Sequence, residues 1–339
     1  TLNFGANGGA EAVIFTGGNT NIYAAMNATA LTKAGGSNLT LFNINNITGN
    51  TTINGSGALI PYLTLDGTAG PTGVVKTPFG SASNAIILNQ GALQIAATQV
   101  GTSTLPILPS GAVSALATLP NPVYVNGDAA INNNNVGNVL QRLSSLTFAD
   151  LGSMRSGVLL TTYGIYVRDT TNLGGENAIF YVPSNQSGLG TVLGGAVTNG
   201  MLTKFGVGPL LLSGTSNSYA LGTVINGDGL NLNVGPLGSL VRNGTPFGSG
   251  PITVNPGAIL RIADVSNISG NVVTVNSDGA GLGGIGLAGN FAPPSFLTSG
   301  TVAGSVFLNA TGRFGGMLAL DALNYTQSLN MATLGGGSM

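Results

Sequence analysis

The chain has 339 residues, and only 6% of them are charged, with nine Lys plus Arg against ten Asp plus Glu. Cysteine, histidine and tryptophan are absent, which excludes a thiolate nucleophile, an imidazole base and a His- or Cys-ligated zinc site built from this chain alone. So few basic residues argue against a nucleic-acid partner, because the neutralisation of phosphates requires clustered Lys and Arg. We therefore expect a protein that is not an enzyme and that holds no cofactor and no metal.

The composition favours a folded, all-β chain. Hydrophobic residues make up 43% of the sequence, and the mean hydropathy is +0.37. The apolar residues come in short runs, such as Ile86-Ile87-Leu88 and Val272-Val273-Thr274-Val275, a pattern typical of short strands joined by tight turns. The longest charge-free stretch, residues 77–127, is interrupted by polar residues and proline, so we expect no membrane-spanning helix.

An internal repeat organises the sequence. Five blocks occur twice in the same order, first from residue 31 and again from residue 202. The pairs are Leu31-Thr32-Lys33 with Leu202-Thr203-Lys204, Leu39-Thr40-Leu41 with Leu210-Leu211-Leu212, Thr52-Ile53-Asn54-Gly55 with Val224-Ile225-Asn226-Gly227, Thr77-Pro78-Phe79-Gly80-Ser81 with Thr245-Pro246-Phe247-Gly248-Ser249, and Asn89-Gln90-Gly91-Ala92 with Asn255-Pro256-Gly257-Ala258. Matched blocks in one order indicate two copies of one structural unit.

Each copy is predicted to consist of a strand, an Asn-Gly turn, a second strand, a longer connection and a Gly-rich turn leading to a further strand. Asn and Gly tolerate positive φ and turn the chain sharply. We favour a parallel coil, or β-solenoid, because such units bury an apolar core by stacking on one another. The alternative is that the Asn-Gly pairs close antiparallel hairpins, which would give antiparallel β-sandwich domains.

The tract between the copies is less regular and is expected to form insertions. It contains the Pro-rich residues 105–109, the Asn run 132–135 and the segment Leu140-Gln141-Arg142-Leu143, the one stretch with helical character. For the Asn run we expect a solvated loop rather than a hydrogen-bonded ladder. We therefore divide the chain into a first repeat region (1–100), an irregular β-rich spacer (101–200) and a second repeat region with a Gly-rich continuation (201–339), and we expect it to be part of a longer protein.

The second copy, residues 202–263, resembles the autotransporter-associated β-strand repeat, also called the passenger-associated transport repeat. The matching residues are Leu202-Thr203-Lys204, Gly206, Gly208, Leu210-Leu211-Leu212, Gly214, Val224-Ile225-Asn226, Gly248-Ser249-Gly250-Pro251, Val254-Asn255 and Gly257-Ala258. The first copy is looser, with Asn43 in place of Gly214. The resemblance implies a right-handed parallel β-helix in an extracellular or bacterial cell-surface protein. It implies no catalytic residues.

Motifs that would carry chemistry have simpler structural explanations. The ten acidic residues are scattered without paired spacing, so carboxylate catalysis is unsupported. Asn226-Gly227-Asp228-Gly229 and Asn276-Ser277-Asp278-Gly279 look like turns rather than calcium sites, because the nonapeptide repeat of calcium-binding β-helices is missing. Residues 281–286 match the spacing G-x-G-x-x-G, but no helix signal follows and no acidic residue stands about twenty positions further on, so we predict a Gly-rich turn region.

Lys33 and Lys204 occupy the same place in the two copies. We expect exposed strand-end charges that discourage edge pairing, with a buried functional amine as the alternative. Taken together, these expectations describe a structural extracellular protein, a stalk, layer or filament subunit that self-associates into a homo-oligomer or polymer.

The alternative function is an adhesin that binds glycans or cell surfaces through loops of the solenoid. The candidate loops are residues 67–76 and 126–138, because variation in a solenoid concentrates in its loops. Aromatic side chains that could stack on sugars are Tyr23, Tyr62, Tyr124 and Tyr163.

Overall fold

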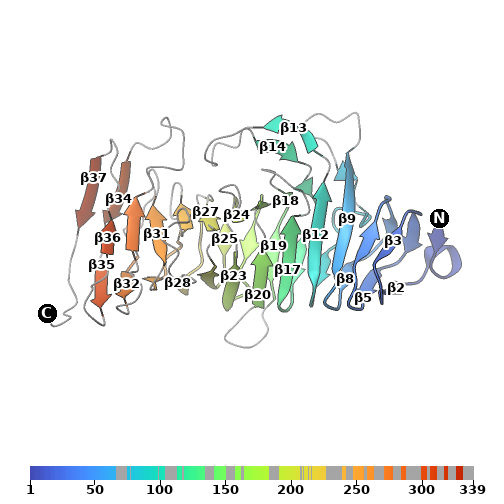
Figure 1. Ribbon diagram of the computed structural model, residues 1–339, viewed down its shortest axis with the longest axis horizontal. Helices are drawn as coiled ribbons and strands as arrows, with labels where there is room; N and C mark the ends of the chain where they lie inside the picture. Colours follow the sequence, from blue (N-terminus) through green and yellow to red (C-terminus); the bar gives the residue numbers. More distant parts are fainter. Residues whose placement is uncertain are drawn as a thin grey trace.

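The computed structural model defines an all-β protein that is elongated along the direction in which its strands are stacked, with the first strands at one end and the last described strands at the other (Figure 1). The part of the chain that it describes comprises residues 1–65, 75–76, 78–97, 99–103, 113–116, 118–133, 141–149, 157–161, 164–182, 191–206, 208, 210–212, 214, 216–226, 239–241, 247–255, 258–262, 271–277, 284–287, 299–303, 306–310, 317–319 and 326–330. The Pro-rich residues 105–109 lie outside these ranges.

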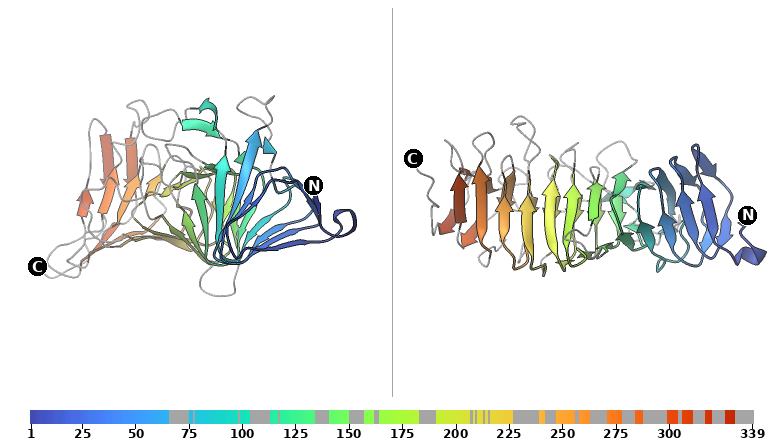
Figure 2. Two further views of the ribbon diagram at one scale, coloured as in Figure 1. Left: turned by 45° about the vertical axis from the view of Figure 1, so that its right-hand side comes forward. Right: turned by 90° about the horizontal axis from the view of Figure 1, so that it is seen from below.

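Three long sheets of stacked strands make up most of the molecule (Figure 2); sheet II extends along nearly the whole described chain, whereas sheet I ends at β25 and sheet III begins at β15. Sheet I contains, in spatial order, β2 (Ala12–Phe15), β5 (Leu31–Ala34), β8 (Thr51–Ile53), β11 (Ile86–Leu88), β16 (Val123–Val125), β19 (Leu146–Phe148), β22 (Thr171–Asn172) and β25 (Val197–Thr198). Sheet II contains β3 (Thr20–Ile22), β6 (Leu39–Leu41), β9 (Ala58–Leu65), β12 (Ala92–Ala97), β17 (Ala129–Asn133), β20 (Gly157–Thr161), β23 (Asn177–Tyr181), β26 (Met201–Phe205), β28 (Gly222–Ile225), β30 (Ile252–Val254), β32 (Val273–Ser277) and β35 (Val306–Ala310), with β10 (Val75–Lys76) on β9.

Sheet III and three small elements complete the fold. Sheet III contains β15 (Thr118–Leu119), β18 (Gln141–Leu143), β21 (Ile165–Val167), β24 (Thr191–Leu193), β27 (Leu210–Leu212), β29 (Ser239–Val241), β31 (Ile259–Ile262), β33 (Gly284–Leu287) and β36 (Met317–Ala319). A short sheet at the start of the chain contains β1 (Leu2–Asn3), β4 (Met26–Ala28) and β7 (Asn46–Ile47), and a 3-10 turn, η1, spans Ala6–Gly8. Two pairs stand apart: β13 (Gln99–Ser103) with β14 (Val113–Leu116), and β34 (Ser299–Ala303) with β37 (Thr326–Asn330).

The chain visits the three sheets in a constant order. From β16 to β24, consecutive strands belong to sheets I, II and III in turn, three times over, and each strand pairs in parallel with the strand one cycle later. We call each such set of three consecutive strands a rung. Antiparallel pairing among the described strands occurs only between β9 and β10 and between β13 and β14. The antiparallel β-sandwich alternative is therefore wrong for these sheets.

The two copies of the repeat occupy different sheets. Leu31-Thr32-Lys33 lies in β5 of sheet I, whereas Leu202-Thr203-Lys204 lies in β26 of sheet II. The next block moves from β6 of sheet II to β27 of sheet III in the same way. The second copy thus begins one sheet later in the order I, II, III than the first copy does. This is possible because each copy encodes a strand, a turn and a strand, which fit the corner between sheets I and II and the corner between sheets II and III alike.

Parallel register stacks like positions on one another and so builds the core. Inward-facing side chains of sheet I form a buried column: Ala12, Leu31, Thr51, Ile86, Val123, Leu146, Thr171 and Val197. Strands about 4.8 Å apart bring such side chains into contact, and a single cluster of buried apolar residues runs from Ala12 to Ala258. Phe148 and Phe180 meet inside it edge to face, with ring centroids 5.2 Å apart.

Three sequence predictions on local structure are changed by the pairing. The segment expected to be helical is a strand: Gln141–Leu143 form β18, paired with β15 and β21, and its alternation of buried and half-exposed residues has period two. Asn132 and Asn133, expected in a loop, belong to β17. Gly284–Leu287 form β33, so the last residues of the G-x-G-x-x-G motif belong to a strand and not to the predicted Gly-rich turn region. Strands from all three expected regions share sheet II.

Candidate functional site

Glycines stack at the corner where the chain passes from sheet I to sheet II, which we call the I–II corner. Gly35, Gly55 and Gly91 all have positive φ, of 87°, 120° and 81°. A Cβ atom on Gly55 would stand 2.5 Å from the carbonyl oxygen of Gly35, and one on Gly91 would stand 2.0 Å from that of Gly55. Only glycine combines this backbone conformation with such close approach.

Beside the glycines runs a chain of hydrogen-bonded amides, the asparagine ladder of Asn54, Asn89 and Asn126. Asn89 Nδ2 donates to Asn54 Oδ1 at 2.7 Å, and Asn126 Nδ2 donates to Asn89 Oδ1 at 3.2 Å. In the second copy, Asn255 Nδ2 donates to Asn226 Oδ1 at 2.6 Å. The sequence predicted no ladder at these positions, although an Asn directly after a strand recurs in two of the five repeat blocks, as Asn54 with Asn226 and as Asn89 with Asn255.

Lys33 and Lys204 are buried, with 0% and 2% of their surface exposed, so the prediction of exposed strand-end charges is wrong. Lys33 faces inward between Ile14 and Ile53 of the neighbouring strands, and its Nζ donates to the carbonyl oxygen of Gly35 at 2.8 Å. Lys204 Nζ donates to the carbonyl oxygen of Gly206 in the same way. Burial lowers the pKa of the Lys33 amine below its ordinary 10.5.

Each amine therefore binds a carbonyl oxygen two residues further on, in the turn that follows its strand. A buried carbonyl without a partner is costly, and the lysine satisfies it. The contact explains why the two copies keep Lys at this position on different sheets. In both copies this hydrogen bond stabilises the turn that follows the strand. The role of the amine is therefore structural.

Buried amides hold the corners from the inside. Asn84 Nδ2 donates to the carbonyl oxygens of Ile47 and Phe79, and Asn121 Nδ2 donates to those of Ser81 and Asn84, all within 3.0 Å. These bonds tie one rung to the next through turns that lack regular strand pairing.

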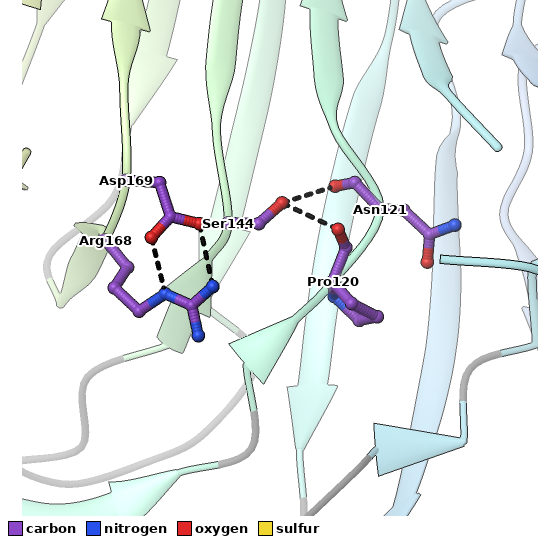
Figure 3. Close-up of polar contacts among 5 residues, drawn as sticks. All are labelled: Pro120, Asn121, Ser144, Arg168 and Asp169. Atoms are coloured by element: carbon purple, nitrogen blue, oxygen red, sulfur yellow. Dashed lines mark hydrogen bonds and ion pairs between the residues drawn. The ribbon is translucent and has the colours of Figure 1, made fainter. Parts of the chain in front are cut away.

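The corner where the chain passes from sheet III to sheet I, the III–I corner, carries the described ion pair. Figure 3 shows it beside Ser144, whose Oγ donates to the carbonyl oxygens of Pro120 at 2.8 Å and Asn121 at 3.2 Å. One rung further on, Arg168 Nε and Nη2 donate to the two carboxylate oxygens of Asp169 at 2.8 and 2.7 Å. The fork is exposed to solvent, and its hydrogen bond to Asp169 raises the pKa of Arg168.

A second arginine lies on the outer face next to this corner. Arg142 of β18 is paired in register with Tyr166 of β21, and its Cζ atom lies 5.8 Å from the centre of the Tyr166 ring. Burial lowers the pKa of Arg142, Tyr166 opposes this shift, and the positive charge of Arg168 adds to it. No sequence motif links Arg142, Tyr166 and Arg168, because only the register places them together.

The structure describes only some of the other predicted site residues. Tyr23 is exposed and stacks on Phe42 with ring centroids 4.4 Å apart, and Tyr124 is exposed on sheet I. Tyr163, the side chain of Tyr62, Asp228, Asp278 and most of the loop at residues 67–76 lie outside the described residues. Where side chains are described, no three His, Cys, Asp or Glu residues gather in a way that could hold a metal ion. Within the same ranges, no helix is long and apolar enough to cross a bilayer.

No known protein family, no curated protein and no solved structure matches the chain.

Proposed function

We propose that the chain winds as a right-handed parallel β-helix and serves as a structural protein of the extracellular or bacterial cell surface, in which it self-associates as a stalk, layer or filament subunit. The cyclic order of strands through sheets I, II and III supports the winding. The right hand follows from general experience, since parallel connections within one sheet are right-handed in about 98% of cases. The extracellular location and the membership of the autotransporter-associated repeat family are proposals that depend on the repeat residues.

The observation that carries the structural role is the stacking of asparagine and glycine residues at the I–II corner. The asparagine ladder and the stacked glycines continue over successive rungs, and the buried lysines of the two copies each bind a carbonyl oxygen of the turn that follows. These contacts engage the polar residues of the corners in stabilising the fold. Such a use of polar residues suits mechanical support rather than turnover of a substrate.

Self-association is supported by the outer surface of β2, which pairs with β5 on one side only in sheet I. β2 presents Val13 and Phe15 to solvent with 61% and 76% of their surface exposed. An edge strand with apolar side chains and few charges is a template for pairing with another chain.

Light scattering at micromolar concentration tests this proposal. We expect oligomers or polymers from the unmodified chain, and a shift to monomer for the double variant V13K/F15K, because charged side chains on an edge strand oppose pairing. Leu221→Lys is the matched control, since Leu221 is also an exposed apolar residue, at 54%, but precedes the interior strand β28. A monomeric unmodified chain would refute self-association.

Glycan binding is a second proposal, and the exposed Tyr23 favours it. Its ring stacks on Phe42 with an angle of 11° between the planes, which fixes it as an apolar platform, and Asn43 Nδ2 donates to the Tyr23 carbonyl oxygen at 3.2 Å. A glycan array tests the proposal with the unmodified chain and Tyr23→Ala. Saturable binding that Tyr23→Ala abolishes supports it, and no binding to any glycan removes it.

A further inference from the structure

The accessible basic side chains of the described part lie close together. The cationic side chains that the structure describes are those of Lys33, Arg142, Arg168 and Lys204, and the two lysines are buried in the core. The two arginines therefore supply the accessible side-chain cations of the described part. Arg142 lies on the outer face of sheet III, in register with Tyr166, and Arg168 follows β21 at the III–I corner of the next rung.

The pair of arginines carries a surplus positive charge. Asp169 is the carboxylate in contact with them, and it engages Nε and Nη2 of Arg168. A guanidinium has five N–H donors, so Arg168 keeps three for another partner, and Arg142 makes its contact with the face of the Tyr166 ring. One guanidinium charge is thus left to be balanced by a monoanion.

The site is held rigidly from below by glycines of the next rung. A Cβ atom on Gly194 would lie 2.5 Å from Tyr166 Oη, which shows that the ring lies directly on that residue. A Cβ atom on Gly195 would lie 1.1 Å from the carbonyl oxygen of Asp169. Both glycines are required by the side chains and backbone above them. Because the Tyr166 ring and the backbone at Asp169 are fixed in advance, a ligand would lose little binding energy to ordering them.

We propose that Arg142, Tyr166 and Arg168 form an anion-binding site for a carboxylate-bearing sugar. A guanidinium matches a carboxylate with two parallel N–H···O bonds, and a single carboxylate neutralises the surplus charge. The described surroundings also carry hydroxyl groups, with Thr118 opposite Arg142 in register and Thr170 exposed after Asp169, as a ligand rich in hydroxyl groups requires. The inference rests on the second proposal, glycan binding, and is independent of self-association.

Titration calorimetry of the full chain with an oligosaccharide of hexuronic acid tests the site, with a neutral oligosaccharide of equal length and with acetate as comparison ligands. We expect binding of the uronate that weakens as sodium chloride is added, and little binding of the other two. Arg142→Gln and Arg168→Gln should each weaken uronate binding at least tenfold, the latter more, because it also releases the Asp169 carboxylate. Lys76→Gln, in β10 on sheet II, is the control and should leave the affinity unchanged.

Asp169→Asn gives the readout that a merely structural role would not produce. It removes the competing carboxylate, and we expect uronate affinity to rise several-fold with thermal unfolding little changed. Equal binding of acetate and uronate would overturn the assignment to a sugar, and unchanged affinity in both arginine variants would overturn the site. Loss of uronate binding in Tyr23→Ala but in neither arginine variant would uphold glycan binding and refute this inference.

Discussion

Replacing Gly91 with alanine should destabilise the protein by about 2–4 kcal/mol, because the I–II corner has no room for a Cβ atom there. The positive φ of 81° costs an L-residue about 1–2 kcal/mol. The new Cβ would also stand 2.0 Å from the carbonyl oxygen of Gly55, against 3.4 Å or more for an ordinary contact. To relieve that overlap, backbone held in register by strands on both sides must move, which costs about 1–3 kcal/mol of stability. Alanine also reduces the conformational entropy of the unfolded chain, which offsets about 0.4–1 kcal/mol of this cost.

Three further glycines separate the two causes. Gly49 has close contact without positive φ, with a Cβ position 2.6 Å from the Thr29 carbonyl oxygen. Gly175 has a φ of 86° but no atom nearer than 3.8 Å, and Gly17 has neither restriction. We expect Gly17→Ala to change stability by less than about 0.5 kcal/mol. Gly175→Ala should cost about 1 kcal/mol and Gly49→Ala about 1–3 kcal/mol, with Gly91→Ala the most costly.

Urea unfolding followed by far-ultraviolet circular dichroism measures the series, with all variants compared through the same probe because stacked rungs need not unfold in one step. If Gly91→Ala proves as stable as Gly17→Ala, the close stacking of the corner is wrong. If Gly175→Ala and Gly91→Ala are equally destabilised, backbone conformation alone explains the glycines and the steric part of the reasoning fails.

Other variants test the buried polar groups. Lys33→Ala should cost about 2–4 kcal/mol, since it leaves a cavity and an unpaired carbonyl. Lys33→Met also leaves the carbonyl unpaired, but it fills the space and removes a buried amine, so it should cost less, about 1 kcal/mol. Because the pKa of Lys33 is lowered in the folded state, the unfolded chain binds more protons than the folded chain between that pKa and 10.5. The stability of the unmodified chain relative to Lys33→Met should therefore rise with pH in this window. Urea unfolding midpoints at several pH values measure this difference. Burial raises the pKa of Tyr219, whose hydroxyl forms a hydrogen bond with Thr223 Oγ1 at 2.8 Å. The contribution of Tyr219 to folding stability should therefore be lost as pH rises above about 10. Tyr219→Phe should remove that pH dependence, at a cost of about 1–3 kcal/mol measured at about pH 7. Asn89→Ala breaks both bonds of the asparagine ladder and should cost about 1–2 kcal/mol in the same unfolding assay; equal stability of Asn89→Ala and the unmodified chain would show that the ladder is incidental.

The candidate site was only partly accessible from the sequence. The repeat blocks contain Asn54, Asn89 and Lys33, so their importance is visible, but their roles are not. A lysine next to a strand end looks solvated, and only the inward orientation of β5 shows that its amine lies inside the corner and binds Gly35. Arg142 and Tyr166 are 24 positions apart, and nothing in their local sequence indicates that they are paired in register.

The sequence by itself determined the all-β class, the short strands and the tight turns, because glycine, asparagine and β-branched residues act locally on φ and ψ. It also determined the repeat, whose blocks recur in order. Tertiary structure decided which sheet each copy joins, the strand state of Gln141–Leu143, and the stacking of like residues at the corners. Those features depend on parallel register between strands 19 or more residues apart, and register is set by the packing of neighbouring rungs rather than by any local preference.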